Sequence, residues 1–197
     1  DRSLIVHIII TTGISSVVTQ LLTIREFLAQ FTGNEFIIAL IFFSWLTLGG
    51  AGTLLANICR NRFFPPSIMR LAWLSLAIAT LSSLQLLLIR MLRNIVFIPG
   101  STTGFYEIFL YTFFTIAPYC ILIGFVLPYS LFVLRRRHPS YSGTSVYIID
   151  NIGDTLGGAI FSFLLIFFTT PLQATLIVNL FLLAATFGLF VSPRTPL

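Results

Sequence analysis

Lysine is absent from the sequence, and charged residues of all kinds make up only 9% of its 197 residues. Soluble globular domains carry about 25% charged residues. With 57% hydrophobic residues and a mean hydropathy of +1.01, the chain has too little polar surface to cover a water-soluble fold. The composition therefore predicts an integral membrane protein.

Cysteine and histidine are also scarce, with two of each. Haem in a helical bundle needs facing histidines, and His7 near one end and His138 in a link do not provide them. No four-cysteine or Cys/His constellation suits iron–sulfur or zinc, and no P-loop or GxGxxG motif is present. No cofactor is predicted, and we interpret Cys59 and Cys120 as residues that pack in the interior.

Long apolar runs dominate the chain, and about 20 apolar residues suffice to cross a bilayer as a helix. None of the runs alternates in polarity as the short strands of a membrane β-barrel do. The sequence therefore predicts one all-α transmembrane domain over residues 1–197, with six spans at about 4–28, 36–58, 67–92, 105–134, 144–169 and 171–191.

Arginines are concentrated in two of the five links between these spans. Arg60, Arg62 and Arg70 flank the second link, and 135–138, RRRH, fills the fourth. Because cytoplasmic links are enriched in basic residues, both links and both termini are predicted to be cytoplasmic, although Arg90 and Arg93 lie at the opposite end. The net charge of +5 indicates orientation and contact with anionic lipid rather than nucleic-acid binding.

The tetrapeptide LGGA occurs at 48–51 and again at 156–159, in the second and fifth spans. These spans occupy corresponding places in the first and second groups of three helices and run in opposite directions, as in an inverted repeat. Glycine pairs also let helices approach closely in lipid. We therefore expect a 3+3 repeat and helix contacts at Gly49, Gly50, Gly157 and Gly158.

Two carboxylates lie in the fifth span, where charge is costly. Asp150 and Asp154 are one helical turn apart, with Tyr147 one turn earlier. Acids inside membrane helices usually face a protein interior or a wet cavity, so these residues are a candidate solute or proton site. The alternative interpretation is a buried ion pair or helix-start capping, with the field neutralised by residues 135–137.

A second polar group lies near the predicted outer end of the first two spans. Arg25 and Glu26 are neighbours in sequence and point about 100° apart on a helix, so each is expected to have its own partner. The group could bind a ligand entering from outside, or it could be interfacial arginine and solvated acid. Its members are Gln20, Arg25, Glu26, Asn34 and Glu35.

Two segments, 13–56 and 147–165, resemble the membrane domain of bacterial proteins in which a major facilitator-like bundle is fused to a spermidine synthase domain. The resemblance implies a half-facilitator bundle in the bacterial inner membrane, while the catalytic domain itself is not in this chain. The segment 52–62 departs from the facilitator link by lacking its aspartate and glycine. The matching residues are Arg25, Glu26, Gly33, Asn34, Glu35, Tyr147, Asp150, Gly153, Gly157 and Gly158.

Two functions remain open at this point. The first is a non-catalytic structural or anchoring subunit of a larger membrane assembly, such as an electron-transfer complex, because one six-helix half does not enclose a pathway and needs a second copy or other subunits. The second is a domain that binds or transports a small cationic solute such as a polyamine, with Tyr147, Asp150 and Asp154 at the inner mouth.

Overall fold

A computed structural model describes residues 2–31, 35–60, 64–98 and 104–191. Six helical spans run antiparallel through the molecule, each long and apolar enough to cross a membrane. The helices are α1 (Arg2–Gln30), α2 (Glu35–Cys59), α3 (Ile68–Val96), α4 (Phe105–Arg137), α5 (Gly143–Ile160), η1 (Phe161–Leu165), α6 (Ile166–Phe168) and α7 (Pro171–Val191).

The described part of the chain contains no strand, so the predicted all-α class is confirmed. The fifth span differs from the prediction in its regularity: a π-helical turn, η1, separates α5 from the short α6. Such turns insert an extra residue into the helical repeat.

The last span begins with a capping box, because the Thr170 amide donates to Gln173 Oε1 at 3.0 Å and the Gln173 amide donates to Thr170 Oγ1 at 3.4 Å.

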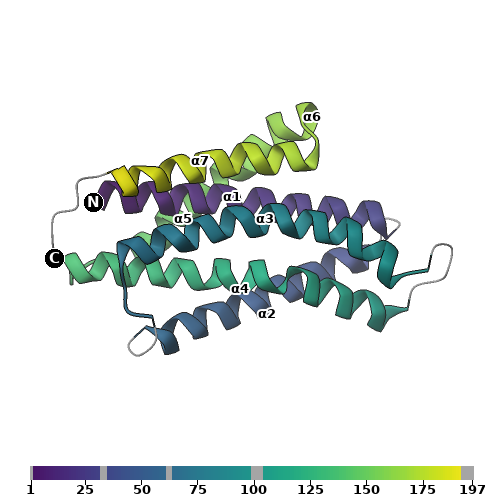
Figure 1. Cartoon of the computed structure of the whole chain (residues 1–197), viewed down its shortest axis with the longest axis horizontal. Coiled ribbons are helices and arrows are strands. Elements are labelled where there is room, and N and C mark those ends of the chain that lie inside the picture. The colour runs from purple at the N-terminus through teal and green to yellow at the C-terminus, as the bar shows by residue number, and fades with distance from the viewer. Residues whose placement is uncertain (1, 32–34, 61–63, 99–103, 192–197) are drawn as a thin grey trace.

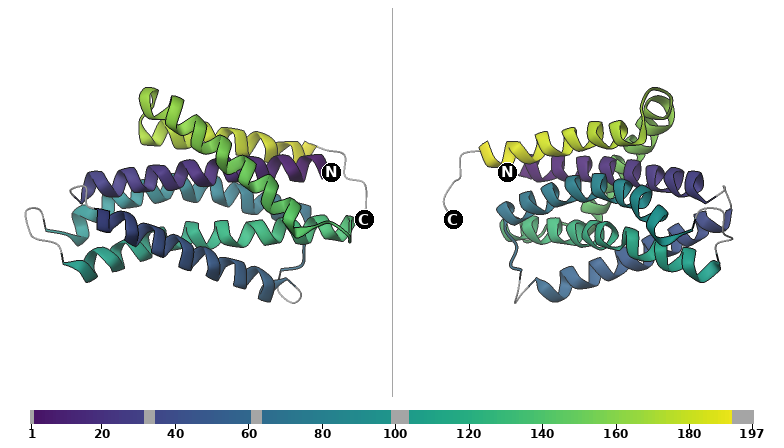
Figure 2. Two further views of the ribbon diagram at one scale, coloured as in Figure 1. Left: turned by 180° about the vertical axis from the view of Figure 1, so that it is seen from behind. Right: turned by 45° about the vertical axis from the view of Figure 1, so that its right-hand side comes forward.

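The helices pair in a definite pattern. α2 packs along α4, and α1 packs along α5. α3 and α7 contact each other; α3 also packs against α4 and α1, and α7 also packs against α1. α5 crosses α1 at a steep angle and diverges from α4 as it leaves the end of the bundle where α1 begins (Figure 2). α7 ends beside the start of α1 (Figure 1). Two buried hydrophobic clusters fill the spaces between these helices.

Glycines set the two closest helix contacts. A Cβ at Gly153 of α5 would overlap the backbone of Ile10, and a Cβ at Gly157 would lie 2.8 Å from the Ile14 carbonyl oxygen. Between α2 and α4, a Cβ at Gly52 would overlap the Ile121 carbonyl, and a Cβ at Gly124 would overlap the backbone of Gly49. Both helix pairs therefore depend on backbone-to-backbone contact, which a larger residue prevents.

The predicted contact glycines behave differently from one another. Gly157 meets α1 directly, and Gly49 is contacted through its backbone, although its own Cβ position is open. The prediction for Gly50 is wrong within this bundle, because a Cβ there would meet no atom within 4 Å. Gly158 makes only an ordinary contact, at 3.8 Å from Val17 Cγ1. The two LGGA motifs are alike in sequence, but their second glycines face away from the close helix contacts.

The arginine-rich links lie together at one end of the bundle. Arg136 Nη1 at the end of α4 donates to the Pro66 carbonyl at 2.8 Å, and Arg70 Nη1 donates to the Pro65 carbonyl at 2.9 Å. The Tyr129 hydroxyl accepts from the Ser67 amide and donates to the Pro65 carbonyl, which fixes the start of α3 against α4. α5, which carries Tyr147 near its start, begins at this end as well (Figure 1).

Candidate cation-binding cavity

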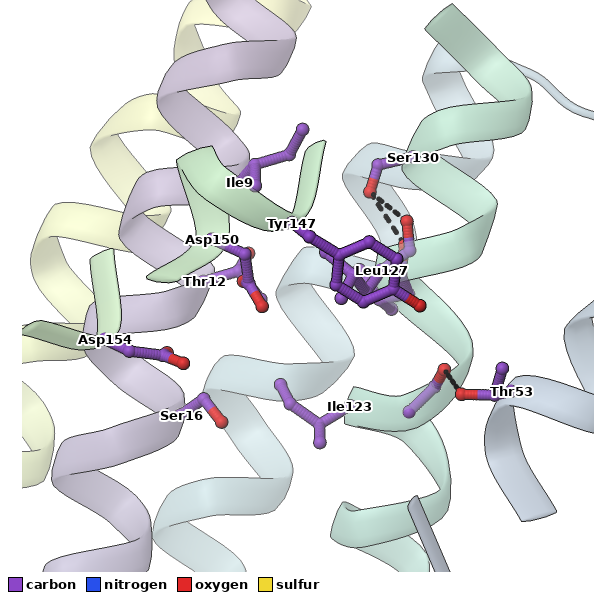
Figure 3. Close-up of a pocket in the computed structure, with 12 residues that line it drawn as sticks. Ile9, Thr12, Ser16, Thr53, Ile123, Leu127, Ser130, Tyr147, Asp150 and Asp154 are labelled. Carbon is purple, nitrogen blue, oxygen red and sulfur yellow. Dashed lines mark hydrogen bonds between the residues drawn. The ribbon is translucent and has the colours of Figure 1, made fainter. Parts of the chain in front are cut away.

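A cavity of about 180 Å³ lies between α1, α2, α4 and α5 (Figure 3). It has room for several water molecules or a small cation. Aliphatic side chains such as Ile9, Ile123 and Leu127 form part of its wall. The polar side chains that line it are Thr12, Ser16, Thr53, Ser130, Tyr147, Asp150 and Asp154.

Asp150 and Asp154 are half-buried on successive turns of α5 and both line this cavity. Asp154 lies directly against α1, since its Oδ1 is 3.1 Å from the position a Cβ at Gly13 would occupy. The same Cβ would be 2.8 Å from the Asp150 carbonyl oxygen. The absence of a side chain at Gly13 therefore makes the space in which the Asp154 carboxylate sits.

Neither carboxylate has a hydrogen-bond or ion-pair partner among the residues whose side chains the structure describes. Nearby arginines are engaged elsewhere: Arg135 Nε donates to the Tyr141 carbonyl at 3.0 Å, and Arg136 bonds the link before α3. The side chain of Arg137 lies outside the described ones. Burying an unpaired carboxylate in apolar surroundings costs free energy. Binding of a cation, protonation or hydration of Asp150 and Asp154 would each lower that cost.

The helix-capping alternative for Asp150 is contradicted by the position of α5. The helix begins at Gly143 with Ser142 as its N-cap residue, and its first turn contains no acid. Asp150 lies seven residues beyond the helix start, where its carboxylate cannot reach the free amides of the first turn. Its charge faces the cavity instead.

Tyr147 lies one turn before Asp150 and lines the same cavity (Figure 3). Its 53% exposure places it at the opening rather than in the interior. Across the cavity, Thr53 Oγ1 of α2 donates to the Gly124 carbonyl at 3.0 Å, and Ser130 Oγ donates to the Val126 carbonyl at 2.7 Å. Because both hydroxyl hydrogens are engaged, the lone pairs of both oxygens remain for a ligand.

The predicted outer polar cluster does not form a single site. Glu26 is buried and pairs with Arg90 of α3 through two short contacts, Nη2 to Oε1 at 2.6 Å and Nε to Oε2 at 2.7 Å. Arg25 and Glu35 are exposed, and Gln20 is half-buried. No hydrogen bond or ion pair joins these three to one another within the described ranges, and Asn34 lies outside them.

Sequence reasoning identified the carboxylates of the cavity but missed the hydroxyls that face them and the partner of Glu26. Thr12 and Ser16 are four residues apart on α1, a spacing that places them on one helix face, and this was the available signal. Arg90 was noted only as an exception to the charge distribution. Its position directly after the apolar run 86–89 was a sign of a buried acidic partner.

Metal chemistry has little support in the described residues, which contain no group of three or more His, Cys, Asp or Glu side chains placed to hold an ion. Cys59 and Cys120 are free thiols, and Cys120 is buried in one of the hydrophobic clusters.

Comparisons with protein-family models, curated proteins and solved structures find no match to this chain.

Proposed function

We propose that this chain is a membrane domain that binds a small cation, such as an amine, in the cavity between α1, α2, α4 and α5. The observation that carries the proposal is the placement of Asp150 and Asp154 in one cavity, without a partner among the described side chains. Two carboxylates on successive turns favour an ammonium group, which donates up to three hydrogen bonds. The hydroxyls of Thr12, Ser16 and Tyr147 provide further oxygen ligands.

The nature of the cation follows from charge and size. Two carboxylates together balance a doubly charged ligand, and a cavity of about 180 Å³ limits it to a short chain or a partly hydrated ion. A diamine or the end of a polyamine meets both conditions. The resemblance to fused spermidine synthase proteins favours the same class of ligand.

A half-facilitator architecture with a 3+3 inverted repeat is part of this proposal. Such a repeat relates α1 to α4, α2 to α5 and α3 to α7, so the contact of α1 with α5 corresponds to that of α2 with α4. Both contacts depend on glycine. The cavity is lined by helices from both groups of three, which is where transporters with such repeats bind their solutes.

The proposed location is the bacterial inner membrane, with both termini in the cytoplasm. Arg70 and Arg136 at one end of the bundle support this orientation, because basic residues are retained on the cytoplasmic side. The cavity, with Tyr147 at its opening, would then be accessible from the cytoplasm. A cytoplasmic amine would meet the carboxylates without crossing the bilayer.

A second candidate function is assembly with other membrane subunits, and the exposure of the fifth span favours it. This span is the least buried of the six. Its outward side chains include Ile148, Ile152, Leu156 and Phe163. A second copy of the chain or the subunits of an electron-transfer complex could pack on this surface, which would make the domain an anchor.

The test of cation binding is equilibrium dialysis of the detergent-purified protein with a radiolabelled diamine. Asp154→Asn keeps the shape of the side chain but removes its charge. Hydrogen bonds to charged groups contribute about 1.5–3 kcal/mol, so the dissociation constant is expected to rise about 10- to 100-fold. Asp150→Asn is expected to act in the same direction.

The control variant is Glu35→Gln, which removes one negative charge from an exposed position at the start of α2. It is expected to bind the diamine as the native protein does, with an unchanged elution volume in gel filtration. Equal affinity of the native protein and Asp154→Asn would exclude the cavity as the binding site. Recovery of the native protein in fixed ratio with other membrane subunits would instead support assembly.

A further inference from the structure

A strip of polar residues runs along α1 from the cavity toward the opposite end of the bundle. Its members, which we call the α1 strip, are Thr12, Ser16, Thr19, Thr23 and Glu26. They are spaced by four, three, four and three residues, so they share one helix face. At a rise of 1.5 Å per residue, the strip spans about 21 Å, most of the bilayer's apolar thickness.

Four of the five residues of the α1 strip are buried inside the bundle, and Ser16, which lines the cavity, is half-buried. Thr19 and Thr23 are fully buried, and Thr12 is 7% exposed. Buried positions are usually occupied by hydrophobic residues, because burying a hydroxyl without a hydrogen-bond partner costs free energy. A row of polar side chains that are mostly buried therefore requires an explanation beyond helix contact.

Two threonines of the strip, like Thr112 of α4, lack the hydrogen bond to a backbone carbonyl that Thr23 and Thr186 make. Thr23 Oγ1 donates to the carbonyl four residues earlier at 2.7 Å, and Thr186 in α7 does the same at 2.7 Å. Thr12 Oγ1 and Thr19 Oγ1 have no hydrogen-bond partner among the described residues, although both are buried. Their hydroxyls are thus left unsatisfied by the chain itself.

Residues that face the strip also carry unpaired polar atoms. Tyr119 of α4 is 1% exposed, and its hydroxyl lies beside Thr19 without a completed hydrogen bond. Gln85 of α3 donates from Nε2 to Thr23 Oγ1 at 2.7 Å, while its Oε1 has no partner in the described part of the chain. Buried polar groups in proteins are satisfied by protein or by ordered water.

We propose that the α1 strip holds a chain of bound water molecules that relays protons between the cavity and the Glu26–Arg90 pair. Successive strip residues are separated by about 4.5–6 Å along the helix. One water molecule making two hydrogen bonds of about 2.8 Å bridges such a gap. The unpaired atoms of Thr12, Thr19, Tyr119 and Gln85 are then the ligands of these waters.

Both ends of the strip reach polar surroundings. Thr12 and Ser16 line the cavity with the two aspartates, and at the other end the Arg90 side chain is 39% exposed while its partner Glu26 is 5% exposed. Each transfer step breaks one O–H bond and forms another, so a proton enters at one end as a different proton leaves at the other. The relay goes beyond cation binding and does not depend on it.

A proton-flux assay tests the relay. The native protein is reconstituted in vesicles with an internal pH-sensitive dye, with valinomycin and potassium to compensate charge, and a pH gradient is applied. Thr19→Val keeps the side-chain shape but removes the central hydroxyl, and it is expected to lower the flux at least tenfold. The matched control is Thr186→Val, an identical change at an equally buried position outside the strip, which should leave the flux unchanged.

The outcomes of the flux assay separate the relay from the cation site. Native vesicles that are no more permeable to protons than protein-free vesicles would overturn the relay, as would equal flux in Thr19→Val and the native protein. Diamine binding by Thr19→Val, measured in parallel, is expected to be retained. Loss of proton flux with retained diamine binding would therefore support the relay along the α1 strip. A failure of the native protein to bind the diamine would instead argue against the cation site in the cavity.

A second measurement detects the bound water without transport. Radiolytic hydroxyl-radical footprinting labels buried side chains that contact ordered water. Tyr119 and Tyr129 are 1% and 0% exposed, but the Tyr129 hydroxyl is bonded to protein whereas that of Tyr119 is not. We expect Tyr119 to be labelled several-fold faster than Tyr129. Equal, slow labelling of both would show a dry strip and overturn the proposal.

Discussion

Replacement of Arg90 by methionine is expected to lower the free energy of unfolding by about 3 kcal/mol. The change leaves Glu26 buried without its partner, and breaking a buried ion pair on one side costs about 3–5 kcal/mol. The lower end of that range applies here because the Arg90 side chain is 39% exposed and thus partly screened. Methionine keeps most of the aliphatic length of arginine, so the loss of stability measures the effect of removing the charge. The measurement is reversible unfolding in mixed detergent micelles.

The double variant Glu26→Gln/Arg90→Met separates the ion pair from lost contacts. Removal of both charges is expected to recover more than half of the stability lost in Arg90→Met. Arg25→Met serves as the control, because Arg25 is exposed and adjacent to Glu26 in sequence; its effect is expected to stay within about 0.5 kcal/mol. An Arg90→Met protein as stable as the native one would mean that the pair does not hold α1 to α3.

Gly153→Ala is expected to be the most damaging single-methyl change at the contact between α5 and α1. The added Cβ would overlap the carbonyl of Ile10, and a backbone atom cannot move aside without separating α5 from α1. Overpacking of this kind costs 1–3 kcal/mol where side chains can adjust. Because the added Cβ overlaps backbone atoms here, we expect the free energy of unfolding to fall by more than about 3 kcal/mol, as measured by the same unfolding assay. Diamine affinity should fall as well, because Asp154 is displaced from Gly13.

Gly158→Ala is the matched control on the same helix. Its Cβ would meet only Val17 Cγ1, at 3.8 Å, which is ordinary contact. Alanine is favoured over glycine in a helix interior by up to about 1 kcal/mol, so this variant is expected to be as stable as the native protein or slightly more stable. Equal destabilisation by both alanines would contradict the close approach of α5 to α1 at Gly153.

The spans could be predicted from the sequence because apolar length alone determines them. The last span illustrates this: its predicted start at Pro171 is confirmed, since proline at the first helical position follows a threonine whose hydroxyl caps the helix. The π-helical turn at Phe161–Leu165 could not be predicted, because no residue type marks it. The all-α class therefore follows from composition, whereas local irregularity does not.

The cavity was only half predictable. Asp150 and Asp154 were visible because charge is rare in an apolar run, but Thr12 and Gly13 are ordinary residues of membrane helices and become part of the site only where α5 crosses α1. The Glu26–Arg90 pair joins residues 64 positions apart, which spacing along a helix cannot reveal. The predicted role of Gly50 was wrong because the motif does not say which glycine faces the neighbouring helix.

Labelling with a hydrophobic carbodiimide tests the central claim, that the carboxylates of the cavity are unpaired and bind a cation, most directly. The reagent forms adducts with free carboxyl groups in apolar surroundings, and peptide mass spectrometry locates them. We expect adducts on Asp150 or Asp154, little reaction at the ion-paired Glu26, and protection of the aspartates by a diamine. Absence of adducts on both aspartates, or labelling that the diamine does not slow, would contradict the account.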